Sequence, residues 1–519
     1  MYLSQSLKRN AQTNKNGIAT RFDGRQRTWS ELRDRVARFA GGLRKLGVEQ
    51  GDRVALLALN SDRYLEYYFG CYWCGAVVVP LNVRWSAGEH AYSLNDSGAA
   101  TFIVDDKFLP MAPTILAEAG DVANLIYMGD GDTPDGWLNY EDVIASAGLL
   151  EDAGCGGEDL AGIFYTGGTT GFPKGVMLPH RGLWSSALGV AYGFNMTRDT
   201  VYLHAAPMFH LADGAFSMGA MVAGGSHAFI PAFDPAKTIE AIAEFGVTDV
   251  LMVPTMVKMV LDNPAFDSAK LATLKQVIYG ASPMPEGVIR QGMDKLPNVG
   301  WCHAYGQTEL SPLITFNPPE HHILEGELSG RLRSIGRAAN CNEVKIVDEA
   351  GAEVPRHTIG EIIVRGPNAM LGYWNKPEET AAALKNGWVH TGDAAHMDDD
   401  GFIYIADRLK DMIISGGENI YSVEIESAIS RHDAVAEVAV VGIPSDEWGE
   451  AVHAIVVPQA DASVSEQEII DHCRELIAGF KCPRSVEIRT ETLPLSGAGK
   501  VLKRDLRAPF WEGRERQVN

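Results

Sequence analysis

Short apolar segments alternate with longer amphipathic segments up to about residue 340 of the chain. The apolar segments are rich in Val, Ile and Tyr, and they read RVALLAL, GAVVVPL, ATFIVDD, NLIYMG, HAFIPAF, DVLMVP and QVIYGAS. Residues 28–47, TWSELRDRVARFAGGLRKLG, are typical of the intervening segments, because apolar residues recur at helical spacing and a glycine ends the run. This alternation predicts an α/β fold with largely parallel, buried strands, in which ligands bind on the loops after the strand ends.

The pattern changes after about residue 340. EVKIVDEAG, GEIIVRG and GFIYIADR are short strands separated by tight glycine turns, which indicates a β-rich subdomain. From Lys410 onward, helical patterns over 422–432 and 465–480 and strand patterns over 435–444 and 451–458 predict a small α+β unit. We therefore expect a large N-terminal domain over residues 1–408 and a small, mobile C-terminal domain over 409–519.

Length and charge narrow the classes of function. A chain of 519 residues is too long for one compact core, and its 46% hydrophobic and 22% charged residues are ordinary for a globular protein. The formal net charge of −22 repels nucleic acids and anionic membranes, so neither is expected as a partner. A polyanionic ligand would need a local pocket of amides or basic side chains.

Cysteine usage and hydropathy indicate a reduced, cytoplasmic enzyme. Seven scattered cysteines do not form a disulfide framework, and Cys71 and Cys74 form a CxxC in apolar surroundings, which favours burial over metal binding or redox activity. The N-terminus lacks the apolar core of a signal peptide. The most apolar long stretch, 216–233, is interrupted by Gly, His and Pro, so we do not expect it to span a membrane.

The segment YTGGTTGFPKG, residues 165–175, predicts a phosphate site. Glycine loses more conformational freedom on folding than any other residue, so four glycines in eleven positions need a functional reason. The segment lies between a predicted strand and a predicted helix, where its amides and threonine hydroxyls would form a cradle for an anion and Lys174 would add a charge. It is not a Walker A motif, because Lys174 lies between Pro173 and Gly175.

This loop resembles the phosphate-binding signature of the acyl-adenylate-forming enzymes, which include acyl-CoA synthetases, luciferases and the adenylation domains of peptide synthetases. Gly167 stands where that signature usually has a second Ser, which removes one hydroxyl donor. Other segments similar to that family are YGQTE, GYWNKPEET, WVHTGD, DRLKDMIISGGENIY, DEWGEAVHAIVV and PLSGAGKVLKRDLR. They follow in the family's order, and the resemblance covers nearly the whole chain.

The resemblance implies a role for each of these segments. Thr308 would contact phosphate, Glu309 would hold Mg²⁺, and Asp393 would bind both ribose hydroxyls, although an Asp in a Thr-Gly-Asp turn is also a common turn residue. The implied catalytic residues are Lys174, Thr308, Glu309 and Lys500. The implied nucleotide-binding residues are Thr166, Gly167, Gly168, Thr169, Thr170, Gly171, Lys174, Gly280, Ala281, Ser282, Ala304, Tyr305, Gly306, Gln307, Thr308, Asp393, Arg408 and Lys500.

The reaction implied by the resemblance has two steps. A carboxylate and ATP give acyl-AMP and pyrophosphate, and the thiol of CoA then displaces AMP to give acyl-CoA. The first step brings an anion toward a polyphosphate, and one pair of like charges about 4 Å apart costs about 4 kcal/mol at an effective dielectric of roughly 20. Mg²⁺, the loop amides, Lys174 and Lys500 would cancel such repulsion.

The resemblance also implies that the small domain rotates about Lys410 between the two steps. The rotation would withdraw Lys500 and bring Ser415, Gly416, Gly417 and Glu418 to the CoA passage, where glycines without side chains would let the pantetheine arm pass. Exposed surface positions are the alternative interpretation for both Lys410 and Lys500.

The acid is less constrained than the reaction. The residues that the resemblance places in the acyl pocket are Trp184, Phe209, His210, Leu211, Asp213, Tyr279 and Ala304. His210 would line the passage or be a core histidine, and Asp213 would bind a polar substrate group or cap a helix. This largely apolar set favours a medium- or long-chain fatty acid. The alternatives are an aryl acid such as a hydroxycinnamate or benzoate, or delivery of the acyl group to an acceptor other than CoA. A homodimer is also an open expectation.

Overall fold

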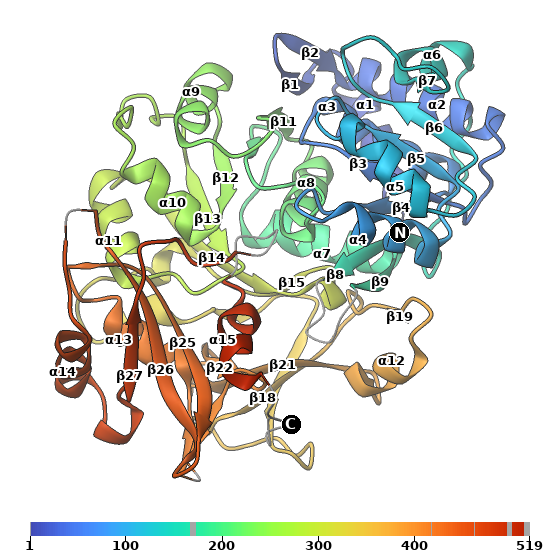
Figure 1. Ribbon diagram of the computed structural model, residues 1–519. Coiled ribbons are helices and arrows are strands. Elements are labelled where there is room, and N and C mark those ends of the chain that lie inside the picture. Colours follow the sequence, from blue (N-terminus) through green and yellow to red (C-terminus); the bar gives the residue numbers. More distant parts are fainter. Residues whose placement is uncertain (1, 167–172, 417, 461, 496–500, 513–519) are drawn as a thin grey trace.

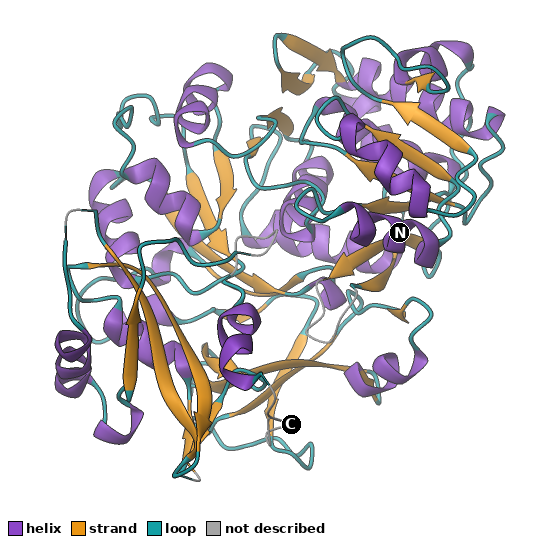
Figure 2. Cartoon of the chain, viewed as in Figure 1, coloured by secondary structure: helices purple, strands orange, loops and turns teal. Residues whose placement is uncertain are grey.

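The computed structural model describes residues 2–166, 173–416, 418–460, 462–495 and 501–512, whose strands form four sheets (Figures 1 and 2). Two large sheets with helices make up the first 340 residues, an antiparallel sheet follows, and a small α+β unit ends the chain. The predicted fold class is confirmed.

The first large sheet has eight strands and is parallel from β8 to β7. In spatial order its strands are β19 (Gly372–Tyr373), β9 (Lys174–Pro179), β8 (Leu160–Thr166), β4 (Val77–Pro80), β3 (Arg53–Leu57), β5 (Thr101–Val104), β6 (Asn124–Tyr127) and β7 (Leu138–Asn139). The β8–β9 and β9–β19 pairs are antiparallel. The buried strands β3, β4 and β5 are the apolar segments that the sequence marks as strands.

The second large sheet has nine strands. In spatial order they are β16 (Arg337–Ala338), β15 (Leu313–Asn317), β14 (Gly300–Gly306), β13 (Gln276–Gly280), β12 (Asp249–Met252), β10 (Val201–His204), β11 (Ser226–Phe229), β1 (Ile18–Phe22) and β2 (Arg25–Thr28). The strands from β14 to β1 are parallel, and those at both edges are antiparallel. The carboxyl end of β14 therefore lies beside that of β13, where ligands of parallel sheets bind.

Helices fill the space between the two large sheets and cover their outer faces. Packed between the sheets are α1 (Ser4–Thr13), α2 (Trp29–Lys45), α3 (Asp62–Cys74), α7 (His180–Gly193) and α8 (Leu211–Ala223). On the outer faces lie α4 (Ala87–Ser97), α5 (Ala112–Glu118), α9 (Pro235–Phe245), α10 (Pro254–Leu261) and α11 (Glu286–Lys295), and α6 (Tyr140–Ser146) packs on α2. The helix predicted from residue 28 begins there because Thr28 and Glu31 form a reciprocal capping box.

The antiparallel sheet and the C-terminal unit complete the chain. The former contains β17 (Glu343–Val347), β18 (Gly360–Arg365), β21 (Trp388–Met397), β20 (Leu384–Lys385) and β22 (Ile403–Arg408), with α12 (Pro377–Ala383) before β20. The latter contains β24 (Glu418–Ile420), β23 (Ile413–Ser415), β26 (Gly449–Pro458), β25 (Val435–Ser445), β27 (Ser485–Ile488), α13 (Ser422–Ile429), α14 (Glu466–Leu476) and α15 (Lys503–Trp511). The chain changes sheets between Arg408 and Ile413, which spans the predicted boundary.

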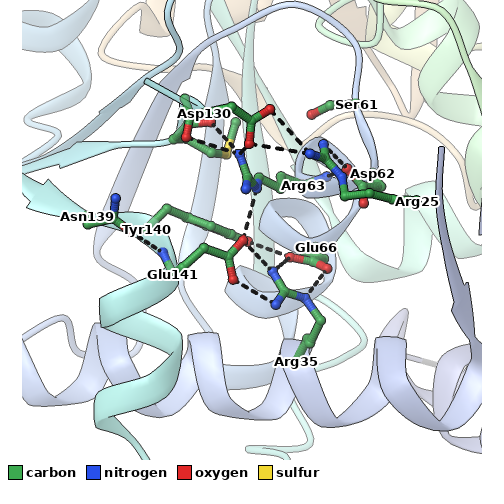
Figure 3. A network of polar contacts seen from close by, with 12 residues as sticks. Arg25, Arg35, Ser61, Asp62, Arg63, Glu66, Asp130, Asn139, Tyr140 and Glu141 are labelled. Carbon is green, nitrogen blue, oxygen red and sulfur yellow. Dashed lines mark hydrogen bonds and ion pairs between the residues drawn. The ribbon is translucent and has the colours of Figure 1, made fainter. Parts of the chain in front are cut away.

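A partly buried ionic network joins the two large sheets (Figure 3). Arg25 of β2 pairs with Asp62 at the start of α3, at 3.2 Å. Arg35 of α2 bridges Glu66 and Glu141 at 2.6 and 2.8 Å. The Asp62 and Glu66 side chains are almost fully buried, so their charges depend on these arginines. The network fixes β2, which belongs to the nine-stranded sheet, against helices that cover the eight-stranded one.

One local prediction is wrong. The sequence favours a strand, a glycine loop and then a helix, but β9 follows the loop and pairs antiparallel with β8 before α7 begins. Val176 and Leu178 of β9 are buried in the core between the sheets, and this burial favours a strand over an earlier helix.

The described residues include all seven cysteines and the helices named above. Cys71 and Cys74 lie on α3 and are fully buried, as expected, and all seven cysteines are free thiols in the structure. Within these ranges no group of three or more His, Cys, Asp or Glu is placed to hold a metal ion. None of the described helices combines the length and apolar character that crossing a membrane requires.

Candidate active site

Two of the predicted nucleotide segments meet at the carboxyl ends of β13 and β14. Gly280 of β13 pairs with Ala304 of β14, and a Cβ at Gly280 would lie 2.1 Å from the Ala304 carbonyl oxygen. The close approach of the two strands therefore requires glycine there. Beyond β14, the chain turns into a 3₁₀ helix, Thr308–Leu310, which carries Thr308 and Glu309.

Asp393 of β21 is held by two of the other predicted residues. Its Oδ2 accepts a hydrogen bond from the Tyr305 hydroxyl at 2.6 Å, and its Oδ1 lies 3.1 Å from Nε of Arg408. The Asp393 carboxylate raises the pKa of Arg408. Burial, and after it the Asp393 carboxylate, raises the pKa of Tyr305, so this hydroxyl remains a donor at neutral pH. The structure thus brings three residues from three predicted motifs into contact.

Glu309 and Lys174 both contact Tyr373 of β19. The Tyr373 hydroxyl donates to Oε1 of Glu309 at 2.7 Å, and Nζ of Lys174 lies 5.4 Å from the centre of the Tyr373 ring. Burial and the adjacent Glu309 carboxylate raise the pKa of Tyr373, so its hydroxyl stays protonated. Tyr373 therefore contacts both a carboxylate and a lysine that are predicted to act on the same triphosphate.

The described part of the phosphate segment consists of its two ends. Thr166, the last residue of β8, pairs with Lys174, the first residue of β9. Residues Gly167, Gly168, Thr169, Thr170 and Gly171 lie outside the described residues, and so does Lys500. The hairpin register places Lys174 at the base of the predicted phosphate loop.

A cavity of about 330 Å³ adjoins these side chains. Its lining includes Lys174 and Tyr373, together with Thr391 and Gly392 of the turn that precedes Asp393. Parts of the eight-stranded sheet and of the antiparallel sheet therefore border one space. The space reaches from the predicted triphosphate lysine to the turn that precedes the predicted ribose carboxylate, and Glu361 of β18 also lines it.

Comparison with known proteins decides the family. The family model described as AMP-binding enzyme matches residues 7–374. The chain belongs to the AMP-binding enzyme family. A second family model, described as AMP-binding enzyme C-terminal domain, matches residues 424–500.

Curated relatives of this AMP-binding enzyme align along nearly all of it. The chain is 37% identical to a feruloyl-CoA synthase from Amycolatopsis sp, over 97% of this chain and 98% of that protein. It is 35% identical to the long-chain-fatty-acid–CoA ligase FadD13 of Mycobacterium tuberculosis, over 93% of each. ATP-bound MatB from Rhodopseudomonas palustris is similar in structure, with a TM-score of 0.88, 31% identity and 99% coverage of both chains. The chain is an AMP-forming acid–CoA ligase that uses ATP and CoA.

Four of the predicted acyl residues of this AMP-binding enzyme, Phe209, His210, Leu211 and Asp213, lie at the start of α8. Phe209 and Leu211 are buried in the core between the sheets, and Trp184 of α7 packs against that core. His210 is the N-cap of α8, and its ring accepts a hydrogen bond from the backbone of Ala212. The alternative that Asp213 caps this helix is therefore wrong.

Asp213 and Tyr279 both have protein partners. The Asp213 carboxylate accepts a hydrogen bond from Tyr202 at 2.9 Å and lies 2.7 Å from Nδ1 of His204, and its side chain is fully buried. The Tyr279 hydroxyl lies 2.8 Å from Nε2 of His322. Asp213 thus needs no polar group of a substrate as a partner. That the seven predicted residues line the acyl pocket remains a prediction.

The predicted CoA segment lies at a hairpin of the C-terminal unit. Ser415 of β23 pairs with Glu418 of β24, and the amide of Gly416 donates to the carbonyl of Trp448 at 2.9 Å. Gly416 has φ +62°, and a Cβ there would lie 2.8 Å from the Trp448 ring. A larger residue at 416 would therefore be strained and would push against Trp448. Gly417 lies outside the described residues.

Sequence reasoning missed Tyr373 and Glu361. Tyr373 lies in GYWNKPEET, a segment that resembles the family, but a tyrosine next to a tryptophan there reads as an ordinary packed aromatic residue. Glu361 lies in GEIIVRG, which reads as an ordinary strand. Only the pairing of distant strands places the first beside Glu309 and the second beside the turn before Asp393.

We expect Tyr373→Phe to lower kcat/KM for ATP by about 3- to 10-fold, because the charged Glu309 carboxylate loses the hydrogen bond that it accepts from the Tyr373 hydroxyl. The ring, and with it the contact to Lys174, is kept. The measurement is the initial rate over a series of ATP and Mg²⁺ concentrations. Tyr192→Phe on the exposed face of α7 is the matched control. An unchanged kcat/KM at every Mg²⁺ concentration would show that the Tyr373 hydroxyl has no role in placing Glu309.

Proposed function

We propose that this ligase activates a medium- or long-chain fatty acid, with Mg²⁺ bound beside Glu309. The observation that carries the nucleotide site is the contact of Asp393 with Tyr305 and Arg408, near the carboxyl end of β14 that leads to Glu309. A ribose acceptor at Asp393 and a metal carboxylate at Glu309 would then lie on connected elements, and this arrangement supports adenylation of an acid.

Glu309 fits the proposed ion. It is a hard oxygen donor of the kind that Mg²⁺ prefers, and the Tyr373 hydrogen bond uses Oε1 and orients the carboxylate. When bound, Mg²⁺ neutralises charge on the phosphates. Coordination through one protein carboxylate suits an ion that keeps several waters and binds mainly through substrate phosphates.

The chain's own residues orient the reactants. Asp393 and Arg408 hold the ribose, Thr308 and the amides of the glycine segment hold the phosphates, and Lys174 offsets negative charge at the triphosphate. Lys500 stabilises the charge that develops as pyrophosphate leaves. No protein nucleophile is required, because the acid itself attacks the α-phosphorus.

The small domain then turns about Lys410 to admit CoA. Support comes from the change of sheet between Arg408 and Ile413 and from two contacts at this point. The amide of Leu409 donates to the Gly392 carbonyl at 2.9 Å, and Arg507 of α15 contacts the Lys410 carbonyl at 3.4 Å. We take residues 1–408 and 409–519 as the two moving parts, with Ser415 to Glu418 beside the CoA passage.

Two acid classes have support. Buried Phe209 and Leu211 and partly buried Trp184 support an apolar acid, and so does the similarity to FadD13. The similarity to a feruloyl-CoA synthase supports an aryl acid as the second candidate.

A reducing cytoplasm is the location we propose for this enzyme. It suits the seven free thiols, of which all but Cys341 are buried.

A panel of acids tests the proposal. CoA-dependent release of AMP would be measured with saturated fatty acids of increasing length, benzoates and hydroxycinnamates, at fixed ATP, Mg²⁺ and CoA. We expect kcat/KM to rise with chain length through the medium-chain acids, because each buried methylene contributes about 0.8 kcal/mol. Turnover of hydroxycinnamates alone would replace the fatty-acid proposal by the aryl one.

A further inference from the structure

Strands β18 and β21 pair through a bulge beside Asp393. Ile363 pairs with His390, and Glu361 pairs with Ala394, so β21 has more residues than β18 between these two pairs. The extra residues lie within Thr391–Asp393 and cannot all join the regular ladder of hydrogen bonds. A bulge of this kind bends its strand and changes the direction of a side chain. Here the side chain at the bulge is the predicted ribose carboxylate.

The Glu361 carboxylate replaces the missing ladder contacts. Its Oε1 accepts a hydrogen bond from the amide of Gly392 at 2.9 Å, and its Oε2 lies 2.7 Å from Nδ1 of His390. Gly392 has φ +71°, a conformation that favours glycine, so the turn is held by both its sequence and this carboxylate. Hydrogen bonds to a charged acceptor are stronger than those between neutral groups.

Hydrogen bonds from Thr391 and Asp393 also hold the turn at Gly392. The amide of Asp393 donates to Oγ1 of Thr391 at 3.1 Å, and the Thr391 hydroxyl donates to the Ile362 carbonyl at 2.8 Å. The Gly392 carbonyl accepts from the amide of Leu409, next to Lys410. Gly392 therefore lies between Glu361 on one side and the segment before the proposed hinge on the other.

We propose that Glu361 is a positioning residue for ATP: its carboxylate fixes the bulge that directs Asp393 toward the ribose. The inference rests on the proposed function, in which Asp393 binds the ribose hydroxyls. Glu361 acts through Asp393, so its effect depends on the hydroxyls that Asp393 holds. Loss of the carboxylate lets the turn relax and weakens nucleotide binding more than it slows the chemistry.

The test compares ATP with 2′-deoxy-ATP and 3′-deoxy-ATP in acid-dependent exchange of labelled pyrophosphate into nucleotide. For Glu361→Ala we expect a KM for ATP about tenfold higher than that of the unchanged enzyme, with kcat within about threefold. With the deoxy nucleotides the same substitution should raise KM by no more than about threefold, because the unchanged enzyme has already lost a contact at Asp393.

Two further variants serve as controls. Glu361→Gln keeps an acceptor for the Gly392 amide. Its KM for ATP should therefore lie at most halfway, on a logarithmic scale, between that of the unchanged enzyme and that of Glu361→Ala. Glu343→Ala removes a carboxylate from β17 of the same sheet, where it forms an exposed pair with Arg365, and it should leave every KM unchanged. If Glu361→Ala yields no folded protein, the same comparison is made with Glu361→Gln. For this variant we expect the KM for ATP to rise about threefold and the KM for each deoxy nucleotide to stay unchanged.

Equal losses with ATP and both deoxy nucleotides would overturn the inference, because Glu361 would then support the sheet without acting through the ribose site. An unchanged KM for ATP in both Glu361 variants would also overturn it. Absence of acid-dependent exchange in the unchanged enzyme would overturn the proposed function itself, so the two failures are distinguishable.

Discussion

Lys500→Ala is expected to slow acyl-AMP formation by about 10²- to 10³-fold, the usual cost of removing one charge-stabilising group from a reaction centre. Thioester formation from supplied acyl-AMP should stay close to that of the unchanged enzyme. The reason is that pyrophosphate has already left before CoA attacks, so the negative charge that Lys500 offsets is absent from the second step.

The two half-reactions are measured separately. Acyl-AMP formation is followed by pyrophosphate exchange without CoA, and thioester formation is followed from synthetic acyl-AMP and CoA. Arg504→Ala is the matched control, since Arg504 lies near Lys500 in the sequence and its side chain is half exposed. Equal losses in both half-reactions would contradict the two-conformation account, because Lys500 would then be needed in both steps.

Lys410→Pro is expected to give the opposite result. Proline fixes its own φ near −65° and restricts the residue before it, so rotation about this position is blocked. Acyl-AMP formation should remain within about threefold of the unchanged enzyme, whereas conversion of acyl-AMP and CoA to thioester should fall by about 100-fold.

Lys410→Ala separates the backbone from the side chain. Desolvation, and after it the nearby Arg408 guanidinium, lowers the pKa of Lys410, whereas the Asp411 and Asp393 carboxylates oppose this shift. Alanine leaves backbone rotation free, and this variant should therefore keep both half-reactions. Normal CoA turnover in Lys410→Pro would contradict the hinge. Loss of the thioester step in Lys410→Ala would assign the effect to the ammonium group.

Local sequence signals account well for the strands and for the reaction class. Val77–Pro80 and Thr101–Val104 are continuous apolar segments because both faces of a parallel strand are buried, and such segments are visible without any partner. The nucleotide motifs are equally local, since Thr308 and Glu309 adjoin in the chain and Asp393 ends a Thr-Gly-Asp turn. Each of these signals is contained in a segment of a few consecutive residues, so it can be read without knowing the fold.

The remaining features depend on pairs of residues that are far apart in the chain. Tyr373 meets Glu309, 64 positions away, only because β19 joins the edge of the eight-stranded sheet. Similarly, Asp213 is enclosed by Tyr202 and His204 through the packing of α8 on β10, which no periodicity reveals. The strand β9 is a different case, because it pairs with its neighbour β8, and the burial of Val176 and Leu178 outweighs the helical pattern that follows.

The most direct test of the account is exchange of labelled pyrophosphate into ATP, with purified enzyme, Mg²⁺ and the best acid of the panel, and with CoA omitted. The account predicts exchange that requires both the acid and the divalent ion, and release of AMP equal to the thioester formed once CoA is added. Formation of ADP, or exchange that proceeds equally well without any acid, would contradict it.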